Sequence, residues 1–177
     1  MNANLLALGI KPETLIERGL VVQQEALELV LAEVDNTGRE FFLTPACKQA
    51  WLAMKQAAQQ DGIDLLMMSA FRSVARQCEI IEAKLAQGES IATILQQCAP
   101  PGYSEHHTGR AIDITTPEEP ELEISFEHTA AFTWLTKHAA DFGFSLSYPR
   151  GNATGFQYEP WHWCFHPKQY EETSAQL

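Results

Sequence analysis

The chain has 177 residues, of which 45% are hydrophobic and 20% are charged. This length and composition are typical of one globular domain, and they exclude a disordered tail or a coiled-coil rod. The 23 acidic residues outnumber the 12 lysines and arginines, which gives a net charge of −11. Because such a charge repels phosphate, we expect no nucleic-acid partner.

The sequence favours a protein that stays where it is made. No apolar stretch approaches the ~20 residues that a membrane-spanning helix requires. Lys11, Pro12 and Glu13 interrupt the opening segment too early for a signal peptide. We therefore expect no membrane span and a cytoplasmic location. The four cysteines form no CxxC pair, so we expect reduced thiols.

Predicted helices and strands alternate irregularly along the chain. Residues 1–22 predict a small helical lead-in. Residues 25–34 fit either a helix or the first strand of a hairpin, and the turn at 36–38 favours the hairpin. Further helices are expected at 45–60, 74–87, 90–97 and 129–142, and strands at 63–71, 110–116, 143–149 and 161–167. The pattern predicts an α+β fold, a small, mainly antiparallel sheet flanked by helices in a single domain. Residues 1–40 are expected to form an N-terminal helical and hairpin appendage.

Residues 158–163 (YEPWHW) combine an acid, a proline, aromatic residues and a histidine. Pro160 disfavours a helix interior, so the segment that follows predicts a strand. Alternation along that strand places the two tryptophans on one face and His162 on the other. The aromatic face suits the core. An imidazole on the opposite face, three residues after Glu159, suits a metal ligand beside a base.

Residues 104–113 (SEHHTGRAID) offer further candidate ligands. Gly109 allows the chain to turn back, so that His106 meets Asp113 on the following strand. With His162 they supply two neutral imidazoles and one carboxylate, the donor set of a catalytic zinc site with one open position. Taken singly, the three residues also fit a hydrogen-bonded loop histidine, a turn acid and a core histidine. Their joint occurrence favours the metal site.

These two segments resemble the motifs of the zinc-dependent D-alanyl-D-alanine carboxypeptidases, the VanY-like peptidases, which include D,D-dipeptidases and L,D-carboxypeptidases. Residues 69–73 (SAFRS) with Gln77, and residues 147–156 (SYPRGNATGF), are similar to further elements of that family in the same order. The resemblance extends from about residue 43 to residue 165. It implies the family fold, a small antiparallel sheet flanked by helices, with residues 41–177 as the zinc peptidase domain.

The resemblance also implies roles for individual residues. The ligands of one Zn²⁺ ion would be His106, Asp113 and His162. Glu159 would be the general base, and Arg72 would bind the scissile carbonyl and its oxyanion. Further contacts along the substrate are expected from Gln77, Ser104 and Tyr148.

The chain departs from the family pattern at three positions. Cys164 stands where an arginine is common, which removes a cation near the site and leaves open which peptide terminus is gripped. Cys164 fits either an inert core thiol or a redox-sensitive group. His107 stands where a glutamine is usual and could compete for zinc. Arg110 replaces an apolar residue, and we expect it to be solvated.

The resulting functional hypothesis is a zinc carboxypeptidase that removes the terminal D-alanine from peptidoglycan-type peptides, with D-Ala-D-Ala specificity favoured. The alternatives are an L,D-carboxypeptidase or D,D-dipeptidase acting on muropeptides, an endopeptidase, and a catalytically inactive zinc-binding module. The substrate partner would be a soluble peptidoglycan-derived peptide, since intact cell wall lies outside the cell. The sequence makes no prediction of oligomeric state.

Overall fold

The computed structural model describes residues 2–167, so the last ten residues of the predicted peptidase domain lie outside the described part. The α-helices are α1 (Asn2–Ala7), α2 (Pro12–Glu17), α3 (Pro45–Gln60), α4 (Val74–Ala86), α5 (Ile91–Gln97) and α6 (Ala130–His138). The 3₁₀ helices are η1 (Glu105–Thr108), η2 (Ile124–His128) and η3 (Ala139–Phe142). The strands are β1 (Val30–Val34), β2 (Glu40–Leu43), β3 (Leu66–Ser69), β4 (Ala111–Thr115), β5 (Phe144–Leu146) and β6 (His162–Phe165).

Two antiparallel sheets confirm the predicted α+β class. The larger sheet has the strand order β3-β4-β6-β5, with every neighbouring pair antiparallel. Strands β1 and β2 pair with each other in a separate two-stranded sheet. This pairing confirms the hairpin that the turn at residues 36–38 favoured over a helix.

The main hydrophobic core lies between the larger sheet and helices α3 and α6. Trp51 and Met54 of α3 are fully buried there beside Ile112 of β4 and Trp163 of β6. Thr44 starts α3, because its hydroxyl accepts a hydrogen bond from the backbone of the first helical turn. The tryptophan face of β6 therefore faces the core, and the face that carries His162 points away from it.

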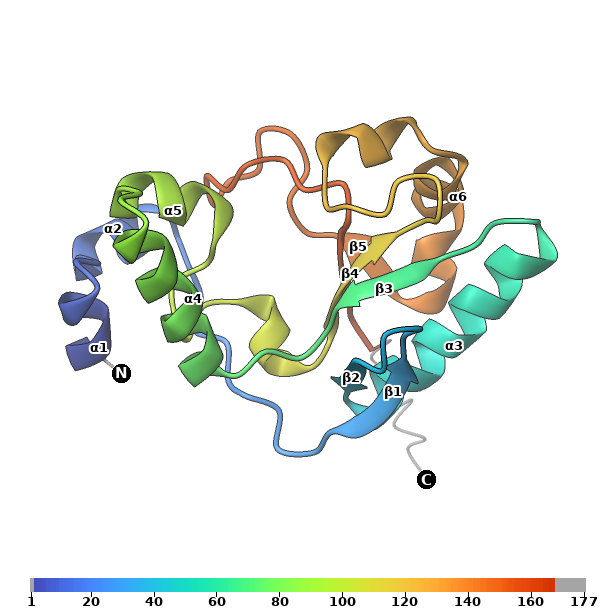
Figure 1. Ribbon diagram of the computed structural model, residues 1–177, viewed down its shortest axis with the longest axis horizontal. Coiled ribbons are helices and arrows are strands. Elements are labelled where there is room, and N and C mark those ends of the chain that lie inside the picture. The colour runs from blue at the N-terminus through green and yellow to red at the C-terminus, as the bar shows by residue number, and fades with distance from the viewer. Residues whose placement is uncertain (1, 168–177) are drawn as a thin grey trace, which may run out of the picture.

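A second hydrophobic cluster joins the N-terminal helices to α4 and α5. Its buried members come from the N-terminal segment and from α4 and α5: Leu5, Leu8, Ile10, Leu15, Ile81, Ile94 and Leu95. Figure 1 shows α1, α2, α4 and α5 grouped at one end of the molecule, and the larger sheet with α3 and α6 at the other. The segment that carries η1 runs between the two groups. The division of the chain at residue 40 into an appendage and a domain stays a prediction.

Several predicted elements are shorter in the structure because their ends lie in loops. The lead-in at residues 1–22 contains two short helices, separated by Gly9 in the left-handed region (φ +76°). The helix predicted over 129–142 is α6 followed by η3, since the last turn tightens to 3₁₀ geometry. Within residues 2–167, none of the helices has the length and apolarity needed to cross a bilayer.

Candidate active site

The register of the larger sheet brings the three predicted ligands together. Asp113 of β4 stands directly opposite His162 of β6. Gly109, at φ +63°, ends η1 in a left-handed conformation and returns the chain so that His106 reaches the same place. His106 Nε2 lies 3.2 Å from Asp113 Oδ2, and His162 Nδ1 lies 3.0 Å from Asp113 Oδ1. All three side chains are buried, and their candidate ligand atoms lie within 4.8 Å of one another.

The outer nitrogen of each imidazole is held by an oxygen acceptor. His106 Nδ1 donates to the carbonyl oxygen of Ala70 over 2.7 Å, which leaves the lone pair of Nε2 facing Asp113. His162 Nε2 donates to Glu105 Oε2 over 3.0 Å, so the Nδ1 atom of His162 faces the carboxylate of Asp113. Such acceptors orient histidine ligands and select their tautomer.

The electrostatics of this cluster fit a bound cation. Burial lowers the pKa of His106, so its bare Nε2 opposes a carboxylate oxygen, a contact between two lone pairs that a cation between them would relieve. A metal ion would bind at His162 Nδ1 in place of a proton. In the metal-free protein burial opposes protonation of His162, but its hydrogen bonds to Asp113 and Glu105 outweigh burial and raise its pKa to about 10. The same histidine contacts, acting against burial, lower the pKa of Asp113. Two imidazoles and one carboxylate match the donor set of catalytic zinc, so these residues fit a Zn²⁺ ion.

Glu159 lies beside this cluster at the end of the loop that enters β6. Its Oε2 is 3.9 Å from His162 Nδ1, and its backbone N–H donates to the carbonyl oxygen of Tyr148 over 3.1 Å. The carboxylate is buried, and burial raises its pKa to about 7. A carboxylate with this pKa exchanges protons readily near neutral pH.

Arg72 approaches the cluster from the loop after β3. Its backbone N–H donates to the carbonyl oxygen of His106 over 3.2 Å. Its guanidinium donates to Gln77 Oε1 over 2.9 Å and to Ser69 Oγ over 3.4 Å. Gln77 is 1% exposed, and its Nε2 donates to the carbonyl oxygen of Ala99 over 2.7 Å. Both polar ends of the Gln77 amide therefore have partners within the protein.

The remaining predicted substrate residues line a small cavity of about 40 Å³ at this cluster. Tyr148 packs with its ring centroid 4.6 Å from that of His162 and 4.9 Å from that of Phe156. Ser104 is buried at the start of η1. The cavity is also lined by Arg72, Gln77, Gln97, Cys98, Ala99, His106, Phe156, Glu159 and His162. The predicted ligand, base and substrate residues thus line one cavity, except Asp113, which lies behind the cavity wall in contact with His106 and His162.

Sequence reasoning gave no role to Glu105, although it directly precedes His106. Its position next to the proposed ligand His106 could have indicated a role, because a carboxylate at that position can reach another proposed ligand, His162. His107 has both ring nitrogens engaged, Nδ1 with the carbonyl oxygen of Arg72 and Nε2 with the backbone N–H of Gly102, so it links two backbone segments and is not directed at the metal cluster. Cys164 is buried, and burial raises the pKa of its thiol, as expected of an inert core cysteine.

The fold and the buried His-Asp-His cluster are those of a metallopeptidase-like protein, and similarity to known proteins specifies the family. Residues 40–168 match the family model described as D-alanyl-D-alanine carboxypeptidase, VanY. This chain belongs to that family, as the motif resemblance predicted.

Individual relatives agree with this assignment. The chain is 32% identical to YodJ of Bacillus subtilis (strain 168) over 90% of its own length and 59% of that protein's. It is 29% identical to VanXYC of Enterococcus gallinarum, a bifunctional D-Ala-D-Ala dipeptidase and carboxypeptidase, over 80% of its own length and 75% of that protein's. The chain therefore spans about three-fifths of one relative and three-quarters of the other.

Solved structures share the fold. The LD-carboxypeptidase LdcB superimposes with a TM-score of 0.72 and 30% identity, covering 81% of this chain and 70% of LdcB. A variant of the D,D-pentapeptidase VanY from a VanB-type resistance cassette, solved in complex with Zn(II), superimposes with a TM-score of 0.64 and 25% identity, covering 84% and 87% of the two chains.

Proposed function

We propose that this chain is a zinc metallopeptidase that hydrolyses the terminal D-alanine from peptidoglycan-type peptides, with D-Ala-D-Ala specificity favoured. It would use one Zn²⁺ ion with His106, Asp113 and His162 as ligands. The observation that carries the proposal is the convergence of these three buried side chains beside Glu159, whose raised pKa suits proton transfer. A Zn²⁺ ion bound there would supply Lewis acidity, which polarises the scissile carbonyl and acidifies water.

Glu159 acts as the proton carrier of the reaction. Its carboxylate accepts a proton from the attacking water and transfers it to the nitrogen of the departing D-alanine. Burial supports this role, because it raises the pKa of Glu159 to about 7 and so balances acceptance against release of the proton. Its backbone hydrogen bond to Tyr148 holds the loop that carries it.

Arg72 binds the carbonyl oxygen of the scissile bond as negative charge develops on it. The guanidinium is oriented in the free protein by Gln77 and Ser69, so little reorganisation is needed when the charge appears. Ser104, Tyr148 and Gln77 line the same cavity and provide further contacts along the peptide.

An L,D-carboxypeptidase that acts on tetrapeptides is the second candidate. It is favoured by the similarity to LdcB, whose TM-score of 0.72 exceeds the 0.64 of the VanY variant. The two activities differ in the stereocentre of the residue before the scissile bond. The proposal includes the cytoplasmic location and soluble peptide substrates expected from the sequence, which activity measurements on cell fractions test.

Release of free D-alanine tests the proposal. Zinc-loaded protein is offered a pentapeptide ending in D-Ala-D-Ala and, separately, the corresponding tetrapeptide. We expect release from the pentapeptide, and none from a Glu159→Ala variant that still binds one equivalent of zinc. Release from the tetrapeptide alone would establish the L,D activity. No release from either peptide, with zinc bound, would indicate an endopeptidase or a zinc-binding module.

A further inference from the structure

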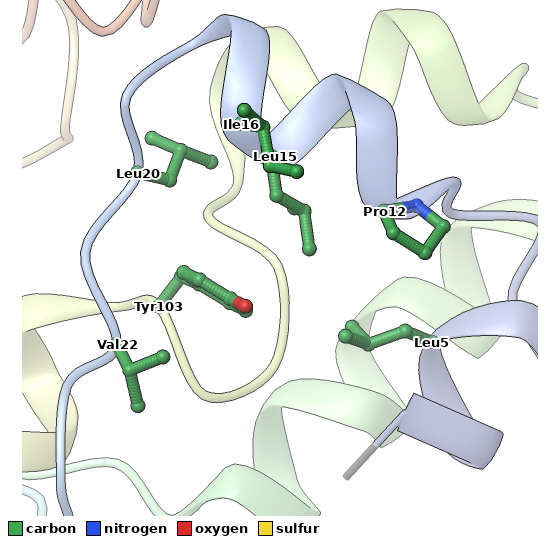
Figure 2. A pocket seen from close by; sticks show the side chains of 7 residues that line it. All are labelled: Leu5, Pro12, Leu15, Ile16, Leu20, Val22 and Tyr103. Atoms are coloured by element: carbon green, nitrogen blue, oxygen red, sulfur yellow. The ribbon is translucent and has the colours of Figure 1, made fainter.

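The N-terminal segment up to β1 lies outside the part of the chain that matches the family model, yet it contacts the chain on either side of Ser104, a residue that lines the candidate active site. The backbone N–H of Gln23 donates to Gly102 O over 2.8 Å, and that of Ala26 donates to His107 O over 2.8 Å. Figure 2 shows Leu15 and Leu20 of this segment on the same groove as Tyr103, the residue before Ser104. The N-terminal segment is therefore packed against the chain that leads into η1.

One side chain extends these contacts to the substrate side of the cavity. Arg18 follows α2 directly, and its Nε donates to the carbonyl oxygen of Thr154 over 2.7 Å. Its Nη1 donates to the carbonyl oxygen of Leu95 in α5 over 2.8 Å. The guanidinium carbon also lies 4.3 Å from the ring centroid of Phe156, within cation–π range. Arg18 thus joins three segments that are far apart in the sequence.

Two aromatic rings connect this contact to the metal cluster. Phe156 lines the cavity and packs against Tyr148, which in turn packs against His162. Asn152 receives the backbone N–H of Phe156 and donates to its carbonyl oxygen, so the loop over residues 147–158 has internal hydrogen bonds of its own. Arg18 ties this loop to α2 and α5, and a backbone hydrogen bond from Gln157 to the carbonyl oxygen of Gln96, over 2.9 Å, also joins the end of the loop to α5.

We propose that Arg18 is a positioning residue, which holds the 147–158 loop so that Tyr148 and Phe156 form the substrate-binding wall of the cavity. This inference rests on the proposed function for its kinetic consequence. Arg18 does not contact the metal cluster or Arg72, so its removal should weaken substrate binding more than it slows the chemical step. A purely structural residue would lower stability without changing KM in the folded protein.

The test compares Arg18→Ala and Arg18→Lys with Lys11→Ala, which removes one positive charge from an exposed position at the other end of α2. In Arg18→Ala we expect KM for the peptide to rise about tenfold or more, a smaller change in kcat, and zinc stoichiometry equal to that of the wild type. Arg18→Lys retains a cation near Phe156 but lacks the planar fork that reaches two carbonyls, so it should give an intermediate KM. Lys11→Ala should match the wild type.

Backbone hydrogen exchange provides a second measurement that does not require activity. We expect faster exchange in residues 147–158 of Arg18→Ala, and no change in Lys11→Ala. Wild-type hydrolysis tests the proposed function separately, since the exchange measurement works whether or not the protein cleaves a peptide. Unchanged exchange in a folded Arg18 variant would overturn the proposal, and so would faster exchange with an unchanged KM in an active enzyme.

Discussion

Gln77 offers a sharp test of how the site is organised, because it joins Arg72 to the backbone of the cavity wall. Gln77→Ala removes the acceptor for Arg72 Nη1, at 2.9 Å, and the donor to Ala99 O, at 2.7 Å, from a position that is 1% exposed. A hydrogen bond to a charged group contributes about 1.5–3 kcal/mol and a neutral one about 0.5–1.5 kcal/mol. We therefore expect the free energy of unfolding to fall by about 2–4 kcal/mol.

The same substitution should act on catalysis through Arg72. With one of its two side-chain anchors removed, the guanidinium can shift by roughly 1 Å, a misplacement on the order of that which costs up to ~100-fold in rate. We expect kcat to fall roughly 10- to 100-fold with little change in KM and no change in zinc stoichiometry.

Urea denaturation and steady-state kinetics of Gln77→Ala measure these two effects, with Gln59→Ala on the exposed side of α3 as the control. If KM rose while kcat stayed at the wild-type value, Gln77 would act by contacting the substrate, as the family resemblance implies, and its expected effect on the orientation of Arg72 would be wrong.

Three further predictions concern the metal cluster and its neighbours. Glu105→Ala should lower zinc affinity about 10- to 100-fold in a chelator competition assay, because His162 loses the acceptor that orients its ring. The control is Glu82→Ala, which removes an exposed acid on α4. Equal zinc affinity in the two variants would contradict this prediction. Removal of zinc by a chelator should lower Tm, since an ion present at 1,000 times its Kd adds about 4 kcal/mol to the stability of the folded state. In the metal-free protein, the folded-state pKa of Glu159 is raised to about 7, so stability falls as pH rises from the unfolded value of 4.5 through 7. Denaturation curves should therefore show that Glu159→Gln gains stability relative to the wild type as the pH rises from 5 to 7.5. If the stabilities of the two proteins changed in parallel with pH, the raised pKa of Glu159 would be wrong.

The metal cluster could be predicted from the sequence because its geometry follows from short-range rules. Alternation along a strand places His162 away from the tryptophan face, and Gly109 permits the turn that returns His106 to Asp113. The sequence could not specify the register of β4 against β6, which sets Asp113 opposite His162. That register depends on core packing between segments 49 residues apart.

The surroundings of the cluster were less predictable, because they depend on contacts between elements that no local pattern specifies. The hydrogen bond from His162 to Glu105 joins residues 57 apart, and the bond from Arg18 to Thr154 joins residues 136 apart. Neither pair has a spacing that indicates contact. Strand ends were misplaced for a related reason: the ladder stops where the partner strand ends, as at β5, and not where the apolar pattern ends.

The two hydrophobic clusters support different residues of the candidate active site. Asp113 and His162 lie on strands of the main core, and His106 is oriented by Ala70, which belongs to that core as well. Arg18 and Gln77, by contrast, lie next to α-helical members of the second cluster around α2, α4 and α5. The proposed metal ligands and the groups that position Arg72 and the 147–158 loop are therefore supported by separate packing units. We therefore expect substitutions in the second cluster to change peptide affinity more than metal affinity.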